Sequence, residues 1–235
     1  MLAAILAGQI RLPEMRKSIY FIFLSATLLL STCAPKSVMN EKGSKKTFQP
    51  ILQFMDYQSG MTFADVGAGS GALTVAMATL MDKSTIYIQD IDSSILKKEY
   101  IDKAIDDFKK QSGRDLRMNN KFIITIGTLK KTNLPDNTFN LIYSNATVHC
   151  FSSLDSMSID LGRKLKTNGV LFFRDGFKKN QDVESYCSDP KCRRPLLTMD
   201  KFLTTMKRNG FELKKQSPNI SGYPILGFTW TKNGN

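Results

Sequence analysis

The feature that most constrains this chain is a glycine-rich turn between an apolar strand and an apolar helix. The strand ends at Asp65, the glycines stand at Gly67, Gly69 and Gly71, and the apolar helix runs through Leu80. Glycine permits positive φ and lets a backbone pass close to a ligand. The N–H groups that open the helix favour a polar or anionic ligand group. The turn therefore predicts a site for a nucleotide-like cofactor.

Two classes of cofactor fit such a turn. Gly67-x-Gly69-x-x-Ala72 satisfies the dinucleotide fingerprint, whose third position accepts Ala. Asp65, however, lies two residues before the first glycine, where a carboxylate suits a cationic amino group better than a pyrophosphate. Asp90 follows a second apolar strand about 20 residues later, where an acid binds the ribose hydroxyls of either cofactor. The position of Asp65 favours a cofactor that carries an amino group.

From residue 47 to residue 230 the chain resembles a class I S-adenosylmethionine-dependent methyltransferase of the small methyltransferase-domain type. The glycine turn with Asp65 is similar to the family's first motif, and Asp90 to its ribose-binding acid. Three later segments are similar to the family in the same order, namely residues 134–142, 144–149 and 161–173. Five ordered matches are far more specific than one glycine turn, and they favour this family over a dinucleotide-binding protein.

The resemblance implies S-adenosylmethionine as the cofactor and assigns roles around it. Asp65 would bind the ammonium group, Asp90 the ribose hydroxyls, and Ile91 the adenine face. Thr128 stands where the family often has an Asp that reaches the adenine, and Asn140 stands where it usually has another Asp, so both soften the cofactor contacts. The cofactor-binding set expected from the resemblance is Asp65, Gly67, Gly69, Gly71, Asp90, Ile91, Thr128 and Asn145.

Two residues are candidates for catalysis. Methyl transfer needs a general base only when the nucleophile is protonated. His149, the single histidine, and Asp175 follow the fourth and fifth predicted strands and are candidates for that base. The alternative for His149 is a structural role in packing and hydrogen bonding. Ser144-Asn145-Ala146-Thr147 stands where nucleobase amino-methyltransferases have Asn-Pro-Pro-Tyr, which counts against such a substrate.

The pattern along the chain predicts an α/β fold. Apolar strands alternate with helices, which is typical of a Rossmann-like parallel sheet with helices on both faces. Two final strands around residues 211–214 and 226–230 resemble the antiparallel hairpin that closes the family's seven-stranded, mostly parallel sheet. The predicted strands are 62–66, 85–89, 121–126, 141–144 and 170–174, and the predicted helices are 47–54, 72–81, 93–110, 154–166 and 199–209.

The first residues differ in kind from this domain. Arg16 and Lys17 precede an apolar run from Ile19 to Leu30, and small residues follow it, as in a secretory signal. The segment around Cys33 resembles a bacterial lipoprotein site, with a plain signal or an uncleaved membrane anchor as alternatives. We therefore expect a signal or anchor segment over 1–35, a basic linker over 36–46 and the methyltransferase domain over 47–235. Met15 is a second candidate start.

The cellular location and the binding partners are predicted from this N-terminal segment and from the net charge of the chain. The signal predicts a membrane-associated or exported protein, although S-adenosylmethionine is made in the cytosol and the cytoplasmic side stays open. The net charge is +12, spread over helix surfaces and the linker, which suits a membrane surface. No nucleic acid is expected as a partner, because no recognition motif is present.

The identity of the methyl acceptor is the property that the sequence determines least. The segment 176–197 is basic, and we expect it to cover the cleft and to favour a small acidic or phosphate-bearing acceptor through Arg193 and Arg194. A solvated surface loop is the alternative. Cys187 and Cys192 could pair as a disulfide, or bind a soft metal together with Cys150, although no metal site is expected. A second hypothesis for the whole protein is a tethered binding module that has lost catalysis.

Overall fold

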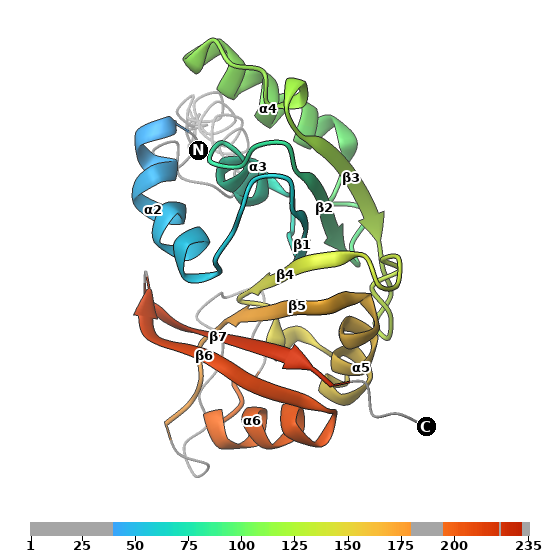
Figure 1. Cartoon of the computed structure of the whole chain (residues 1–235). Helices are drawn as coiled ribbons and strands as arrows, with labels where there is room; N and C mark the ends of the chain where they lie inside the picture. Colours follow the sequence, from blue (N-terminus) through green and yellow to red (C-terminus); the bar gives the residue numbers. More distant parts are fainter. Residues whose placement is uncertain (1–39, 180–194, 221, 232–235) are drawn as a thin grey trace, which may run out of the picture. The chain divides into compact units, whose positions relative to one another are not determined.

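A computed structural model describes residues 40–179, 195–220 and 222–231. The strands among them form one seven-stranded sheet (Figure 1). The strand order is β3-β2-β1-β4-β5-β7-β6. The first five strands are parallel, and β7 runs antiparallel to both β5 and β6. The predicted fold class is confirmed. The strands are β1 (Thr62–Val66), β2 (Thr85–Asp90), β3 (Lys121–Ile126), β4 (Phe139–Asn145), β5 (Leu165–Arg174), β6 (Phe211–Ile220) and β7 (Tyr223–Trp230).

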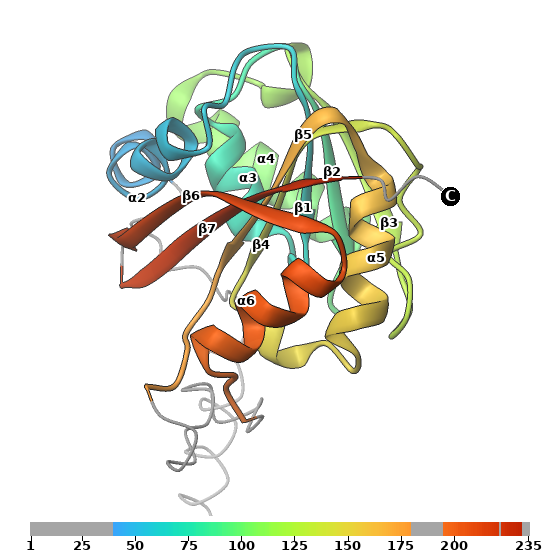
Figure 2. The same ribbon diagram turned by 60° about the horizontal axis from the view of Figure 1, so that its bottom comes forward.

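Helices cover both faces of the sheet (Figures 1 and 2). Because successive strand residues point to opposite faces, Leu141 and Tyr143 of β4 belong to one core and Ile142 to the other. The first core lies under α2, α3 and α4, and the second lies under α5 and α6. These helices are α2 (Glu41–Phe54), α3 (Ala72–Ala78), α4 (Lys98–Ser112), α5 (Leu154–Lys164) and α6 (Met199–Arg208), with short 3-10 turns η2 (Leu116–Met118) and η3 (Val148–Cys150).

The first helix begins earlier than the sequence indicated. Asn40 caps α2 by accepting a 2.7 Å hydrogen bond from the Gly43 N–H, so residues 41–46 are helical. The predicted linker over 36–46 is therefore wrong from residue 41 onward. Phe48 and Ile51 are buried in the first core and anchor the helix over the sheet. The basic residues that looked like a linker lie on the exposed side of this helix.

The fourth helix begins later than predicted. Asp92 Oδ1 accepts hydrogen bonds from the N–H and the hydroxyl of Ser94, which holds a tight turn in place of a helical start. The helix starts at Lys98 and not at residue 93. The last two strands are longer than predicted, with 10 residues in β6 and 8 in β7, since they pair with one another over most of their length.

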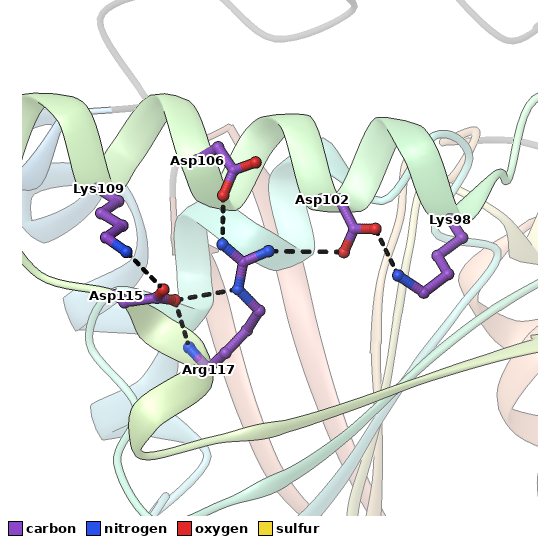
Figure 3. A network of polar contacts seen from close by, with 6 residues as sticks. All are labelled: Lys98, Asp102, Asp106, Lys109, Asp115 and Arg117. Atoms are coloured by element: carbon purple, nitrogen blue, oxygen red, sulfur yellow. Dashed lines mark hydrogen bonds and ion pairs between the residues drawn. The ribbon is translucent and has the colours of Figure 1, made fainter.

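The exposed face of α4 carries a network of charges (Figure 3). Arg117 of η2 contacts Asp106, lies 3.7 Å from Asp102, and donates through Nε to Asp115 at 3.1 Å. Lys109 reaches the same Asp115 at 3.1 Å, and Lys98 pairs with Asp102. The network fastens η2, and with it the start of β3, to α4. Paired charges on a solvated surface account for part of the high lysine content of this helix.

Among the described residues, no helix is long and apolar enough to cross a membrane. The apolar run 19–30 lies outside them, as do residues 36–39 of the predicted linker.

Candidate functional site

The glycine turn after β1 is held against the end of β2. The N–H groups of Gly67 and Ala68 both donate to the Gln89 carbonyl at 2.9 Å. The Gly69 N–H donates to Asp90 Oδ2 at 2.7 Å. The three glycines have φ values of 77°, 58° and 75°, in the left-handed region that glycine adopts without steric cost. The three alternate glycines thus provide three positive-φ positions in a single turn that leads into α3.

The three glycines differ in what surrounds them. A Cβ at Gly67 would lie 2.3 Å from Thr147 Cγ2, and one at Gly71 would lie 2.2 Å from Ile101 Cδ1. Packing against Thr147 therefore requires Gly67, whereas at Gly71 the end of the Ile101 side chain could shift and the positive φ is the stronger requirement. A Cβ at Gly69 would meet nothing within 4 Å. Gly69 is the position at which the backbone of the turn lies open to a ligand.

Asp65 is a buried carboxylate at the end of β1. Only 6 % of the residue is exposed, and its Oδ2 accepts a 2.6 Å hydrogen bond from the Thr74 hydroxyl. Burial raises the pKa of Asp65 to about 6, although the contact with Thr74 lowers it and the nearby Asp90 raises it further. An ionised Asp65 is costly without a cation beside it, so the site suits a ligand with an ammonium group.

Asp90 lies where the sequence placed it, at the end of β2. Its Oδ2 accepts the Gly69 N–H and its Oδ1 accepts the Asp92 N–H at 2.9 Å. The carboxylate therefore fixes the glycine turn in addition to its predicted role toward a ribose. Ile91 beside it is 47 % exposed and Leu129, after β3, is 54 % exposed. These apolar side chains offer surfaces suited to a flat aromatic base.

Thr128 is engaged within its own turn. Its N–H donates to the Lys131 carbonyl at 2.7 Å, and its hydroxyl oxygen accepts the N–H groups of Lys130 and Lys131. Its predicted contact with the adenine stays a prediction. Asn140 lies at the other end of the sheet, where its Oδ1 accepts the Thr62 N–H at 3.0 Å. The expectation that Asn140 softens the cofactor contacts is therefore wrong.

A cavity of about 140 Å³ lies between α2 and the carboxyl ends of the strands. Asp65 and Gly67 form one part of its wall, and residues of β4 and β5 form another. Helix α2 closes the remaining side with Phe48 and Ile51. The lining residues are Thr47, Phe48, Ile51, Asp65, Gly67, Ala68, Leu73, Met77, Tyr143, Asn145 and Arg174.

Arg174, at the end of β5, is a cavity residue that the sequence did not single out. Its Nη1 donates to Asn145 Oδ1 at 2.6 Å, and its Nε donates to the Ile220 carbonyl at 3.1 Å. The guanidinium lies 5.2 Å from the ring centroid of Tyr223. The available signal was a basic residue at the carboxyl end of a predicted strand, which reaches the ligand edge of a parallel sheet.

Tyr143 of β4 lies beside Arg174 and Asn145. Its hydroxyl is 3.3 Å from Asn145 Oδ1, and burial raises the pKa of the phenol well above its ordinary value, against the opposing effect of the Arg174 charge. Tyr143 therefore stays protonated and acts as a hydrogen-bond donor. Asn145 lines the cavity, and its side chain contacts Arg174 and Tyr143. Its predicted contact with the cofactor stays a prediction.

The two predicted catalytic residues are brought together. His149 Nδ1 lies 2.9 Å from Asp175 Oδ1, and the two side chains are 5 % and 3 % exposed. Asp175 also accepts the N–H groups of Val148 at 2.8 Å and Gly176 at 2.7 Å. The contact with Asp175, followed by one with Cys150, raises the pKa of His149 to about 11. Neither His149 nor Asp175 lines the cavity, and their catalytic role stays a prediction.

Several predicted residues fall outside the part of the chain that the structure describes. They are Arg193 and Arg194 of the expected acceptor lid, and Cys187 and Cys192. Within residues 40–179, 195–220 and 222–231, no group of three or more His, Cys, Asp or Glu side chains is placed to hold a metal ion. The pairing of Cys187 with Cys192 stays a prediction.

The residues present fit S-adenosylmethionine. Asp65 offers a buried carboxylate for its ammonium group, Gly69 an open backbone position, and Asp90 a carboxylate next to exposed Ile91. Residues 64–173 match the family model described as a methyltransferase domain. The chain carries a methyltransferase domain. The protein is an S-adenosylmethionine-dependent methyltransferase, and S-adenosylmethionine is its cofactor.

Solved structures share the fold of this methyltransferase. An S-adenosylmethionine-dependent methyltransferase from Aquifex aeolicus is 19 % identical, with 84 % of this chain and 97 % of that chain covered and a TM-score of 0.56. The YcgJ protein from Bacillus subtilis is 14 % identical, with 78 % and 98 % covered and a TM-score of 0.57. The cyclase SpnF is 15 % identical, with 78 % and 80 % covered and a TM-score of 0.57. A search of curated proteins finds no match.

Proposed function

We propose that this methyltransferase transfers a methyl group from S-adenosylmethionine to a small-molecule acceptor bound in the cavity under α2. The observation that carries the proposal is the composition of the cavity wall. Asp65 and Gly67, expected to bind the cofactor, share one cavity of about 140 Å³ with Tyr143, Asn145 and Arg174. Of the second group, only Asn145 was expected to contact the cofactor, so Tyr143 and Arg174 are left to contact an acceptor. A cavity of this size suits a small acceptor group better than a macromolecular surface.

The bound cofactor supplies an already activated methyl group, so the protein has mainly to align the reactants and exclude water. Asp65 and the glycine turn would hold the amino-acid portion, and Asp90 the ribose. Phe48 and Ile51 of α2 cover the cavity with apolar side chains and limit the entry of water. Tyr143 remains protonated and offers a hydrogen bond to a bound group.

The pairing of His149 with Asp175 supports a positioning role. A protonated imidazole cannot accept a proton, and the pair connects the segment after β4 to the end of β5. Through this connection it sets the position of two cavity residues, Asn145 and Arg174. Whether either side chain also acts on the acceptor is tested by the variants described in the Discussion.

The proposal is tested with the full chain in detergent, S-adenosylmethionine carrying a labelled methyl group, and an extract of metabolites and lipids. We expect S-adenosylhomocysteine to bind and label to enter a small-molecule fraction. Asp65→Asn is the matched variant, which should bind S-adenosylhomocysteine weakly and give little labelled product. Binding of S-adenosylhomocysteine without any labelled product would instead support a tethered module that has lost catalysis.

We further propose that the first 35 residues attach the protein to a membrane while the domain stays on the cytoplasmic side, where S-adenosylmethionine is made. The apolar run 19–30, preceded by Arg16 and Lys17, supports attachment. An alkaline phosphatase fusion joined after Met39 puts the reporter in place of the domain, whose first described element is α2 with its cap at Asn40. An inactive, stably produced fusion in the membrane fraction is expected, and an active one would place the domain outside the cytoplasm.

A further inference from the structure

The turn that follows β3 lies at the edge of the sheet where the cofactor is expected. Asp90 of β2 pairs in register with Ile126 of β3, and the Asp90 carbonyl accepts the Gly127 N–H at 2.9 Å. The turn, residues 127–132, is thus attached directly to the strand end that carries the expected ribose ligand. Its Leu129 is 54 % exposed. A base on a ribose held by Asp90 would therefore lie against this turn.

The backbone of this turn has one N–H group that is left for a ligand. The Thr128 N–H donates to the Lys131 carbonyl at 2.7 Å, and the N–H groups of Lys130 and Lys131 donate to the Thr128 hydroxyl. The Leu129 N–H makes no hydrogen bond to any residue that the structure describes. Backbone N–H groups in folded proteins are paired with protein, water or ligand. The Leu129 N–H is thus suited to an acceptor atom of a bound base.

Ser152 fixes the tip of the turn. It lies in the segment between η3 and α5, and its hydroxyl donates to the Leu129 carbonyl at 2.8 Å. The Lys130 N–H of the same peptide unit donates to the Thr128 hydroxyl at 3.3 Å. The peptide unit after Leu129 is therefore held at both its carbonyl and its N–H. These contacts fix the orientation of Leu129, and with it the direction of its own N–H.

The two ends of the turn are held without Ser152. At one end, Thr132 is fully buried, and its N–H and hydroxyl donate to Asp160 of α5 at 2.8 Å and 2.6 Å. At the other end, a Cβ at Gly127 would lie 2.4 Å from Gln89 Nε2, so this glycine packs closely against β2. Because Ser152 is exposed, its replacement opens no cavity. Removal of its hydroxyl therefore releases the tip and leaves both ends in place.

We infer that Ser152 is a positioning residue for recognition of the cofactor's base. Because Asp90 is expected to hold the ribose, the tip of the turn reaches the edge of adenine farthest from the sugar, where the ring nitrogen N1 is an acceptor. Ser152 acts through Leu129, whose N–H donates to this nitrogen. The inference goes beyond the proposed function, since it rests on the cofactor site beside Asp90 and needs no identified acceptor.

The inference is tested by calorimetry on the full chain in detergent with S-adenosylhomocysteine and S-inosylhomocysteine. In the second ligand N1 carries a proton and cannot accept the Leu129 N–H, so the unaltered protein should bind it about tenfold more weakly. Ser152→Ala should weaken the binding of S-adenosylhomocysteine about threefold to tenfold, as for one lost hydrogen bond, and that of S-inosylhomocysteine much less. The ratio of the two affinities therefore falls. Ser152→Thr keeps the hydroxyl and should restore this ratio.

Two further variants separate recognition of the base from a general effect on the fold. Ser59→Ala removes another exposed hydroxyl that donates to a backbone carbonyl, that of Asp82 at 3.0 Å, at the opposite edge of the sheet. It should bind both ligands like the unaltered protein. Leu129→Ala removes the apolar side chain and keeps the backbone N–H, so it should weaken both ligands by a similar factor.

The inference is overturned if Ser152→Ala binds both ligands like the unaltered protein. It is also overturned if this variant weakens both by the same factor, because a structural role alone gives that result. Equal binding of the two ligands by the unaltered protein would mean that the Leu129 N–H does not contact N1, and would overturn it as well. Failure of the proposed function is a different result, namely no labelled product from any extract while S-adenosylhomocysteine binds with this preference.

Discussion

The Thr74 hydroxyl donates a 2.6 Å hydrogen bond to the buried Asp65 carboxylate and so connects the end of β1 to the first turn of α3 across the glycine turn. Asp65 therefore has a partner that orients it but no cation within the described structure that compensates its charge. Burial raises its pKa to about 6, so the carboxylate becomes ionised within the range of ordinary assays.

We expect the affinity for S-adenosylhomocysteine to fall about tenfold between pH 7 and pH 5. One unit below its pKa, about a tenth of a carboxyl group is ionised, and the ligand's ammonium group needs the ionised form. Calorimetry over this range is the measurement. Asp65→Asn should bind weakly without this pH dependence. Thr74→Val loses the contact that lowers the pKa, so its affinity should begin to fall at a higher pH. A flat profile in the unaltered protein would contradict the assignment.

The same pKa makes a prediction for the stability of the protein without ligand. The pKa of Asp65 is about 6 in the folded state and 3.8 at its ordinary value, so between these values the folded protein binds the proton more tightly. The contribution of Asp65 to the free energy of unfolding therefore decreases as pH rises from about 4 to 6. Urea unfolding of Asp65→Asn, compared with the unaltered protein across this range, isolates that contribution.

Asp90→Ala should weaken the binding of S-adenosylhomocysteine by about 1–3 kcal/mol, as expected for lost hydrogen bonds to a charged acceptor. It should also lower the free energy of unfolding, because the Gly69 N–H loses its acceptor. Asp92→Ala is the matched control, since Asp92 caps the next turn through Ser94 and does not contact the glycine turn. If both variants bind S-adenosylhomocysteine with equal affinity, the role of Asp90 in cofactor binding is contradicted.

Asp175→Ala and His149→Gln should each destabilise the fold by about 3–5 kcal/mol near pH 7, the usual cost of removing one partner of a buried ion pair. Their affinity for S-adenosylhomocysteine should remain within about twofold, because neither residue lines the cavity. The pKa of His149 is raised to about 11 in the folded state. The stabilisation is thus complete below about pH 6.5 and is lost as pH rises toward 11.

Denaturant unfolding at several pH values follows this loss, and the difference between His149→Gln and the unaltered protein should shrink from pH 7 to pH 10. A general base would behave differently. Replacing a general base would leave the stability almost unchanged. It would lower turnover of the identified acceptor while the affinity for the cofactor stayed the same.

Ser144→Ala should be neutral or should stabilise the protein by up to about 1 kcal/mol. The Ser144 hydroxyl on β4 is fully buried and has no hydrogen-bond partner among the described residues. A buried hydroxyl without a partner loses its hydration and gains nothing in return. Thermal unfolding measures the effect, with Ser158→Ala as a control, because that hydroxyl donates to the Asp155 carbonyl at 3.0 Å. Clear destabilisation in Ser144→Ala would contradict the prediction.

The sequence determined the glycine turn, the acids at the ends of β1 and β2 and the alternation of strands and helices along the chain. These depend on local rules: positive φ for Gly67, Gly69 and Gly71, and apolar periodicity for the elements around them. The start of α2 did not follow from such rules. Residues 41–46 are basic and look like a linker, and they become helical because Phe48 and Ile51 bury one face of the helix against the sheet and Asn40 caps its end.

The tertiary structure alone decided which side chains meet. Asn145 and Arg174 stand far apart in the sequence and pair in register across β4 and β5, which places the guanidinium in the same cavity as Asp65. The pairing of His149 with Asp175 depends on the same two strands, and it turns two separate candidates for a base into one buried ion pair. Residue types and spacing show what each side chain can do, but the distances that select among these possibilities arise only when the strands are aligned.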